Sequence, residues 1–151
     1  MTKPPFKDLL FISIQMLLFV AYLLPISIGF FTINLLVKYL FLGLSVLGFL
    51  VIILAIIQLD KNLTPFPSPK KNGNLINNGL YKFVRHPIYT GIIICTITFG
   101  VYNQNIWRIG IGVVLWILFY FKSIYEEKML CQKFNQYIDY KNNTGRFFPF
   151  F

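Results

Sequence analysis

Four apolar stretches separated by polar segments dominate the pattern of the sequence. The first runs from Leu9 to about Phe31 and the second from about Tyr39 to Leu59. Both reach the roughly 20 residues that a helix needs to cross a hydrocarbon core. The third, from Ile88 to Val101, is shorter than a comfortable span, and the fourth runs from Trp107 to about Lys122. Short turns join the first to the second and the third to the fourth, so the pattern predicts two antiparallel helical hairpins.

A different pattern follows the fourth stretch. From Ile124 to Tyr140 no helix breaker occurs, and Leu130, Phe134 and Tyr137 recur at i, i+4 and i+7. This spacing predicts an amphipathic helix with one apolar face, able to lie at the membrane surface and fold back over the preceding loop.

The longest polar segment is a loop with three prolines, Pro65, Pro67 and Pro69, followed by Lys70. The prolines exclude a regular helix and favour an extended, semi-rigid chain. The loop is interpreted either as a plain linker or as a segment whose lysines reach a substrate or lipid headgroups.

Composition places the chain in a membrane. Of its 151 residues 56% are hydrophobic, 19% are aromatic and only 13% are charged, which is too apolar for a soluble domain of this size. We therefore predict an all-α integral membrane bundle of about four transmembrane helices, with a cytoplasmic proline-rich loop and a C-terminal amphipathic helix. Residues 1–151 are expected to form a single domain, and the first helix to be retained because no small-residue cleavage site follows it.

The charge distribution sets the expected orientation. The net charge is +9, but the basic residues flank apolar runs instead of forming the stripe that binds nucleic acid. With both termini on one side, the other side holds only Lys38 and Arg108 of the 14 basic residues. The positive-inside rule then makes both termini cytoplasmic. The two cysteines have no partner pattern, so neither a disulfide framework nor a metal site is expected.

Candidate chemistry begins at the only histidine. His86 follows Arg85 and precedes Pro87, which suits the first position of a helix. A helix N-terminus favours an anionic group, and Arg85 and His86 would reinforce that preference. Tyr89 and Gly91 follow within about one turn. The alternative interpretation makes Arg85 a cation at the membrane edge, His86 a loop residue and Pro87 an ordinary helix cap.

A second candidate is the acidic pair Glu126 and Glu127, where the fourth span leaves the membrane. Acids are uncommon there because the cytoplasmic leaflet is negative. A cationic partner such as Arg85, or a bound cation, would explain them. The alternative is a solvated helix face.

Together these stretches resemble the membrane methyltransferases related to isoprenylcysteine carboxyl methyltransferase and the phospholipid methyltransferases. The first match is Gly79-Leu80-Tyr81 with Val84-Arg85-His86-Pro87-Ile88-Tyr89-Thr90-Gly91. The second comprises Glu126, Glu127, Leu130, Phe134, Tyr137, Tyr140, Thr144 and Arg146-Phe147-Phe148-Pro149. The resemblance covers roughly residues 38–151 and leaves out the N-terminal span and turn, 1–37. It is to short bacterial members, which implies a bacterial cytoplasmic membrane.

The resemblance implies an S-adenosylmethionine pocket, closed by the cytoplasmic loop and the tail, and a lipophilic acceptor that enters from the bilayer. The acceptor would be a carboxylate, thiol or amine of a prenylated or lipid-like molecule. The implied catalytic residues are Arg85, Glu126 and Glu127. The implied cofactor-binding residues are Tyr81, His86, Pro87, Tyr89, Gly91 and Glu127. No metal is implied, and the acceptor and the oligomeric state stay open.

Two departures from the family pattern are visible. Lys122 stands near the position where prenylcysteine enzymes often have an arginine, and Asn135 stands where relatives have glycine. An NADPH-dependent sterol-type reductase is an alternative, since Cys131 and Phe134 are similar to the C-terminal segments of those enzymes. However, Ile88 stands where their Arg-His-Pro motif is followed by an asparagine. A non-enzymatic membrane scaffold is the other alternative.

Overall fold

The computed structural model describes residues 5–70 and 72–149. Within these ranges the chain forms five α-helices and two short 3-10 helices. The α-helices are α1 (Phe6–Leu23), α2 (Leu35–Leu59), α3 (Pro87–Tyr102), α4 (Ile106–Lys133) and α5 (Tyr137–Asn143). The 3-10 helices, η1 and η2, are Asp60–Asn62 and Gly79–Lys82.

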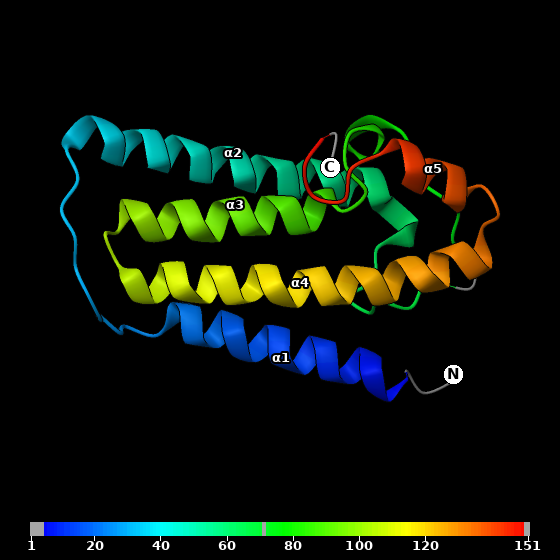
Figure 1. The fold of residues 1–151 in the computed structure, drawn as a ribbon, viewed down its shortest axis with the longest axis horizontal. Coiled ribbons are helices and arrows are strands. Elements are labelled where there is room, and N and C mark those ends of the chain that lie inside the picture. The colour runs from blue at the N-terminus through cyan, green and yellow to red at the C-terminus, as the bar shows by residue number, and fades with distance from the viewer. Residues whose placement is uncertain (1–4, 71, 150–151) are drawn as a thin grey trace.

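The four long helices lie side by side in the order α2, α3, α4, α1 (Figure 1). The connection between α1 and α2 lies at one end of the bundle. The loop between α2 and α3 gathers with α5 at the other end. All chemistry-bearing segments predicted from the sequence therefore meet at one end of the molecule.

Small residues allow the central helices to approach closely. A Cβ atom added at Gly91 of α3 would lie 2.7 Å from the carbonyl oxygen of Gly48 in α2. Gly112 of α4 meets the side chain of Ile97 in the same way, at 2.8 Å. Helices in lipid associate through such close packing, because burial of apolar surface does not drive them together there.

Three of the helical segments are long and apolar enough to cross a membrane, namely Phe6–Leu23, Leu35–Asn62 and Ile106–Lys133. The fourth, α3, has 16 residues and lies between α2 and α4. Many of their leucine, isoleucine and phenylalanine side chains are exposed, as lipid contact requires. The predicted all-α membrane bundle is confirmed, with three long spans and one shorter helix.

The first helix ends earlier than the hydrophobic pattern predicts. It stops at Leu23, because Pro25 has no backbone N–H and holds Leu24 in an extended conformation with a ψ of 141°. The following apolar residues form an extended connection. The second helix begins at Leu35 because the side chain of Asn34 caps it by accepting from the N–H of Val37.

The helices at the C-terminal end also differ from those that the sequence predicts. The predicted amphipathic helix from Ile124 to Tyr140 is wrong in its extent: α4 continues to Lys133, residues 134–136 break the helix, and α5 has only seven residues. Asn135 lies in this break without a left-handed backbone. The break turns α5 back toward the segment around Tyr81, whose carbonyl oxygen accepts from the hydroxyl of Tyr140.

Candidate active site

His86 lies at the start of α3, as the sequence predicts. It is the N-cap residue, and Pro87 follows at the first helical position. The C-terminal tail runs beside this entry: the N–H of Arg85 donates to the carbonyl of Gly145 (2.9 Å) and that of His86 to Arg146 (3.1 Å). These two bonds fix the tail against the motif.

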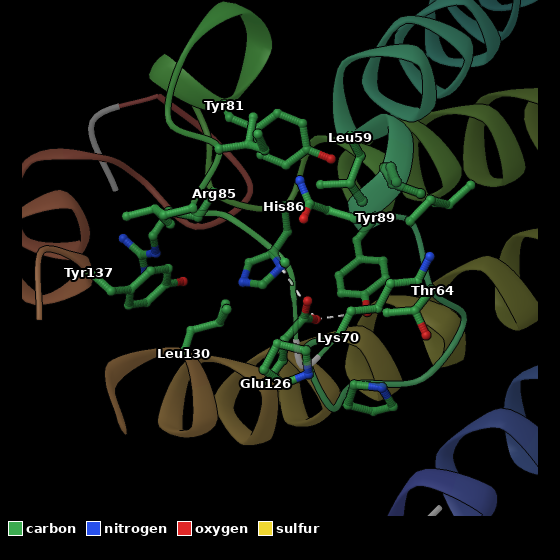
Figure 2. A pocket seen from close by; sticks show the side chains of 18 of the residues that line it. Leu59, Thr64, Lys70, Tyr81, Arg85, His86, Tyr89, Glu126, Leu130 and Tyr137 are labelled. Carbon is green, nitrogen blue, oxygen red and sulfur yellow. Dashed lines mark hydrogen bonds and ion pairs between the residues drawn. The ribbon is translucent and has the colours of Figure 1, made fainter. Parts of the chain in front are cut away.

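A cavity of about 340 Å³ opens beside His86, within the range typical of small-molecule sites. Figure 2 shows the side chains of Tyr81, Arg85, His86, Tyr89 and Glu126 around it. The proline-rich loop, α4 and the segment from Phe134 to Tyr140 complete its wall. Its lining combines polar side chains such as His86 and Glu126 with apolar ones such as Ile56, Ile88 and Ile92.

The imidazole of His86 lies between the two acids. Its Nε2 is 3.2 Å from Oε1 of Glu127, and its Nδ1 is 3.8 Å from Oε2 of Glu126. The hydroxyl of Tyr89 donates to the same Glu126 oxygen at 3.0 Å. The Tyr89 ring stacks between His86 and Phe119, so the two segments identified in the sequence meet at one site, and Glu126 faces the cavity.

Glu127 joins three segments of the chain. Its carboxylate accepts hydrogen bonds from Arg85 Nε and from Arg146 Nη2, each at 3.0 Å. It also lies 3.4 Å from Nζ of Lys141. Arg85 also donates to the carbonyl oxygens of Lys141 and Thr144. Since Glu127 is 1% exposed, these partners supply the compensation that a buried carboxylate requires. The pairing of Arg85 with the acidic pair was expected, and it connects the loop, α4 and the tail.

The predicted residues fall into two groups. Tyr81, Arg85, His86, Tyr89 and Glu126 line the cavity. The remaining three, Pro87, Gly91 and Glu127, are not among its lining residues. Pro87 starts the helix, Gly91 packs against the backbone of α2, and Glu127 holds the tail. The geometry therefore gives these three a supporting position rather than a place on the cavity wall.

Sequence reasoning missed the hydroxyl of Tyr137 as a site group. The helical spacing predicted only that Tyr137 belongs to an apolar helix face. In the structure Tyr137 lines the cavity and is 1% exposed. Its hydroxyl points across the cavity toward His86 (Figure 2) and has no hydrogen-bond partner within the described residues. Burial, and then the nearby charge of Glu127, raises the pKa of Tyr137 well above its ordinary value, so the group stays a neutral donor.

The fold and the cavity together define a helical integral membrane protein with a cavity at one end of its bundle. A comparison with known families identifies the class further. The model of the family "Phospholipid methyltransferase" matches residues 36–137, more than half of the chain. The chain therefore belongs to the phospholipid methyltransferase family, which includes enzymes of the isoprenylcysteine carboxyl methyltransferase type.

Individual relatives agree with this assignment. Protein-S-isoprenylcysteine O-methyltransferases B and A of Arabidopsis thaliana are 34% and 31% identical over 83 residues, 54% of this chain and 42% of each relative. The chain thus aligns with less than half the length of these relatives. A solved structure of a eukaryotic intramembrane Ras methyltransferase, isoprenylcysteine carboxyl methyltransferase, is similar with a TM-score of 0.70 and 23% identity. That likeness covers 95% of this chain and 50% of the other, and it concerns the fold.

Proposed function

We propose that the protein transfers a methyl group from S-adenosylmethionine to a lipophilic acceptor at the cytoplasmic surface of a bacterial inner membrane. The observation that carries the proposal is the meeting of His86, Tyr89 and Glu126 on one cavity that apolar side chains also line. Family membership supports the reaction class. The concentration of basic residues at the same end supports the orientation.

The cavity has groups suited to each part of the cofactor. The carboxylate of Glu126 suits a cationic sulfonium or ammonium, while Arg85, His86 and the N-terminus of α3 suit a carboxylate. The buried Tyr137 hydroxyl, which lacks a protein partner, is a donor that a bound ligand would satisfy. When bound, S-adenosylmethionine would supply an activated methyl group for in-line displacement.

The protein's own contribution is then orientation, electrostatics and exclusion of water. Glu127, held by Arg85 and Arg146, fixes the tail beside the entry to α3. A carboxylate or thiolate acceptor needs no base. An amine acceptor would need one, and Glu126, which faces the cavity, and His86 are the available groups.

Family membership favours this reaction over the two alternatives, and binding assays separate them. The reductase interpretation requires retention of NADPH, whereas the scaffold interpretation requires no cofactor at all. The methyltransferase interpretation requires retention of S-adenosylmethionine by the purified protein.

The test is incubation of the purified protein in nanodiscs with methyl-labelled S-adenosylmethionine and total membrane lipid, followed by identification of the labelled product. His86→Ala and Glu126→Gln should abolish labelling. Asp139→Asn, which removes an exposed acid of α5, should not. Absence of any labelled lipid with the unmodified protein, or equal labelling by the His86 and Glu126 variants, would contradict the proposal.

A further inference from the structure

Asp8 is a buried acid in the first turn of α1, outside the residues 36–137 that the family model matches. The residue is 0% exposed. The positive end of the helix dipole lowers the cost of a carboxylate in this turn, but a buried carboxylate still requires hydrogen bonds. Oδ2 accepts from the backbone N–H of Ser68 in the proline-rich loop at 3.3 Å, and Oδ1 has no hydrogen-bond partner within the described residues. One oxygen of this buried carboxylate is thus committed to the loop.

The part of the loop that Asp8 contacts forms a wall of the cavity. We call residues 63–70 the strap. Its three prolines, Pro65, Pro67 and Pro69, all line the cavity, and the side chain of Pro67 is fully buried. A proline-rich segment is extended and semi-rigid. The position of the strap therefore sets the shape of this wall.

The strap has few backbone groups with which to attach itself. Proline has no N–H, so between Pro65 and Pro69 only Phe66 and Ser68 carry one. The N–H of Phe66 donates to Oγ1 of Thr64 at 3.1 Å, within the strap itself. The N–H of Ser68 is then the one backbone donor of this stretch left for another element, and it goes to α1.

Side chains of α4 also hold the strap. Nζ of Lys122 donates to the carbonyl oxygen of Pro65 at 3.3 Å, and Nζ of Lys133 donates to a further carbonyl oxygen of the strap. The hydroxyl of Ser68 contacts Sδ of Met129, a weak acceptor, at 3.4 Å. The strap belongs to the connection between α2 and α3 but is attached to α1 and α4. It therefore closes one side of the cavity, which residues of all four long helices line.

We propose that the strap is a gate of the cavity and that Asp8 is the latch that keeps the gate closed. The proposal rests on the methyl transfer proposed above, and it concerns how the methyl donor enters and how the demethylated product leaves. Because the strap is semi-rigid, release of its anchor at Ser68 detaches its neighbours as well. Exchange of a ligand enclosed by the strap then follows the population of molecules in which the strap is detached.

A latch changes the rates of ligand exchange without changing the affinity. The hydrogen bond between Asp8 and Ser68 joins two groups of the protein, so it contributes equally with and without a ligand. Weakening this bond raises the open population of the free and of the bound protein by the same factor. The association and dissociation rate constants therefore rise together. A merely structural role, or direct contact with the ligand, would weaken binding without accelerating association.

The test measures both rate constants for S-adenosylhomocysteine by surface plasmon resonance, with the protein in nanodiscs. Asp8→Leu has a side chain of similar size but no acceptor. Both rate constants should rise about tenfold or more in this variant, as for loss of a hydrogen bond to a charged group. The dissociation constant should stay within about twofold, because an equal change in both rates cancels in their ratio. Asp8→Asn keeps an acceptor oxygen and should raise both rates by a smaller factor.

Two substitutions of Ser68 test the other half of the bond. Ser68→Pro removes the N–H and should reproduce the faster exchange. Its combination with Asp8→Leu should add no further acceleration, since both substitutions remove one interaction. Ser68→Ala keeps the N–H and loses only the contact with Met129, so its rate constants should match those of the unmodified protein.

Two results would overturn the latch. One is an unchanged pair of rate constants in Asp8→Leu, or in Ser68→Pro, which decides the matter if Asp8→Leu does not fold. The other is a weaker affinity without faster association. Failure of the unmodified protein to bind S-adenosylhomocysteine would instead overturn the proposed function, and the gate with it.

Discussion

The substitution Glu127→Gln tests how the tail is held beside the entry to α3. It preserves side-chain volume but removes the negative charge that faces Arg85, His86 and Arg146. The side chains of Arg85 and His86 are 8% and 5% exposed, whereas that of Lys141 is 42% exposed. The Lys141 contact is therefore screened by solvent and contributes little.

Breaking a buried ion pair by removing one partner costs about 3–5 kcal/mol. Because the Arg146 side chain is 20% exposed, we use the lower end of that range. About 3 kcal/mol corresponds to a roughly 100-fold larger population of molecules with the tail detached, since 1.4 kcal/mol is a factor of ten.

Limited trypsin digestion measures this population, because Lys141 and Arg146 are cleavage sites within the tail. Cleavage there should accelerate roughly 100-fold in Glu127→Gln when closing is fast relative to cleavage. In Asp139→Asn, which removes an exposed acid of α5, it should stay at the original rate. Equal rates in the Glu127 variant and the unmodified protein would refute the assignment of Glu127 as the residue that holds the tail.

Three further predictions concern packing and the buried hydroxyls. Gly91→Ala should destabilise by about 1–3 kcal/mol in denaturant unfolding, because its Cβ would lie 2.7 Å from the Gly48 carbonyl oxygen, whereas Gly110→Ala meets open space and should be neutral. Tyr137→Phe should leave the ligand-free protein equally or more stable while weakening S-adenosylmethionine binding in titration calorimetry, because its hydroxyl lacks a protein partner. Burial raises the pKa of Tyr81, Tyr137 and Tyr140 above the ordinary 10.0. The contribution of these groups to the free energy of unfolding is therefore fully present below about pH 10. Above that pH it falls by up to about 1.4 kcal/mol per pH unit for each group, and the fall is less steep in Tyr137→Phe. A free energy of unfolding that does not change with pH in this range would contradict this burial.

The parts of the fold that follow from local chemistry were predictable. Apolar runs of sufficient length mark helices in lipid, and the His86-Pro87 pair marks the start of α3. The end of α1 was misplaced because the hydrophobic residues continue past Pro25 in an extended connection. Hydrophobicity reports burial in lipid or protein, not backbone conformation.

The site was predictable only in part for a similar reason. The opposite charges of Arg85 and the acidic pair indicated that they meet, but the identical chemistry of Glu126 and Glu127 gave no means to distinguish them. Packing makes the distinction: one turns to the cavity and the other to the cations of the loop and tail. Gln15 carried no motif, because only the packing of α1 against α4 brings its amide oxygen to Lys122 and to the cavity wall.

The central claim is that His86 and Glu126 enclose a positively charged methyl donor at one end of the bundle. Titration calorimetry of S-adenosylmethionine into the protein in nanodiscs tests it most directly, with Glu126→Gln and His86→Ala beside Asp139→Asn. We predict saturable binding to the unmodified protein and to Asp139→Asn, weakened about tenfold or more in the two site variants. Absence of binding, or the same affinity in all four proteins, would contradict the claim.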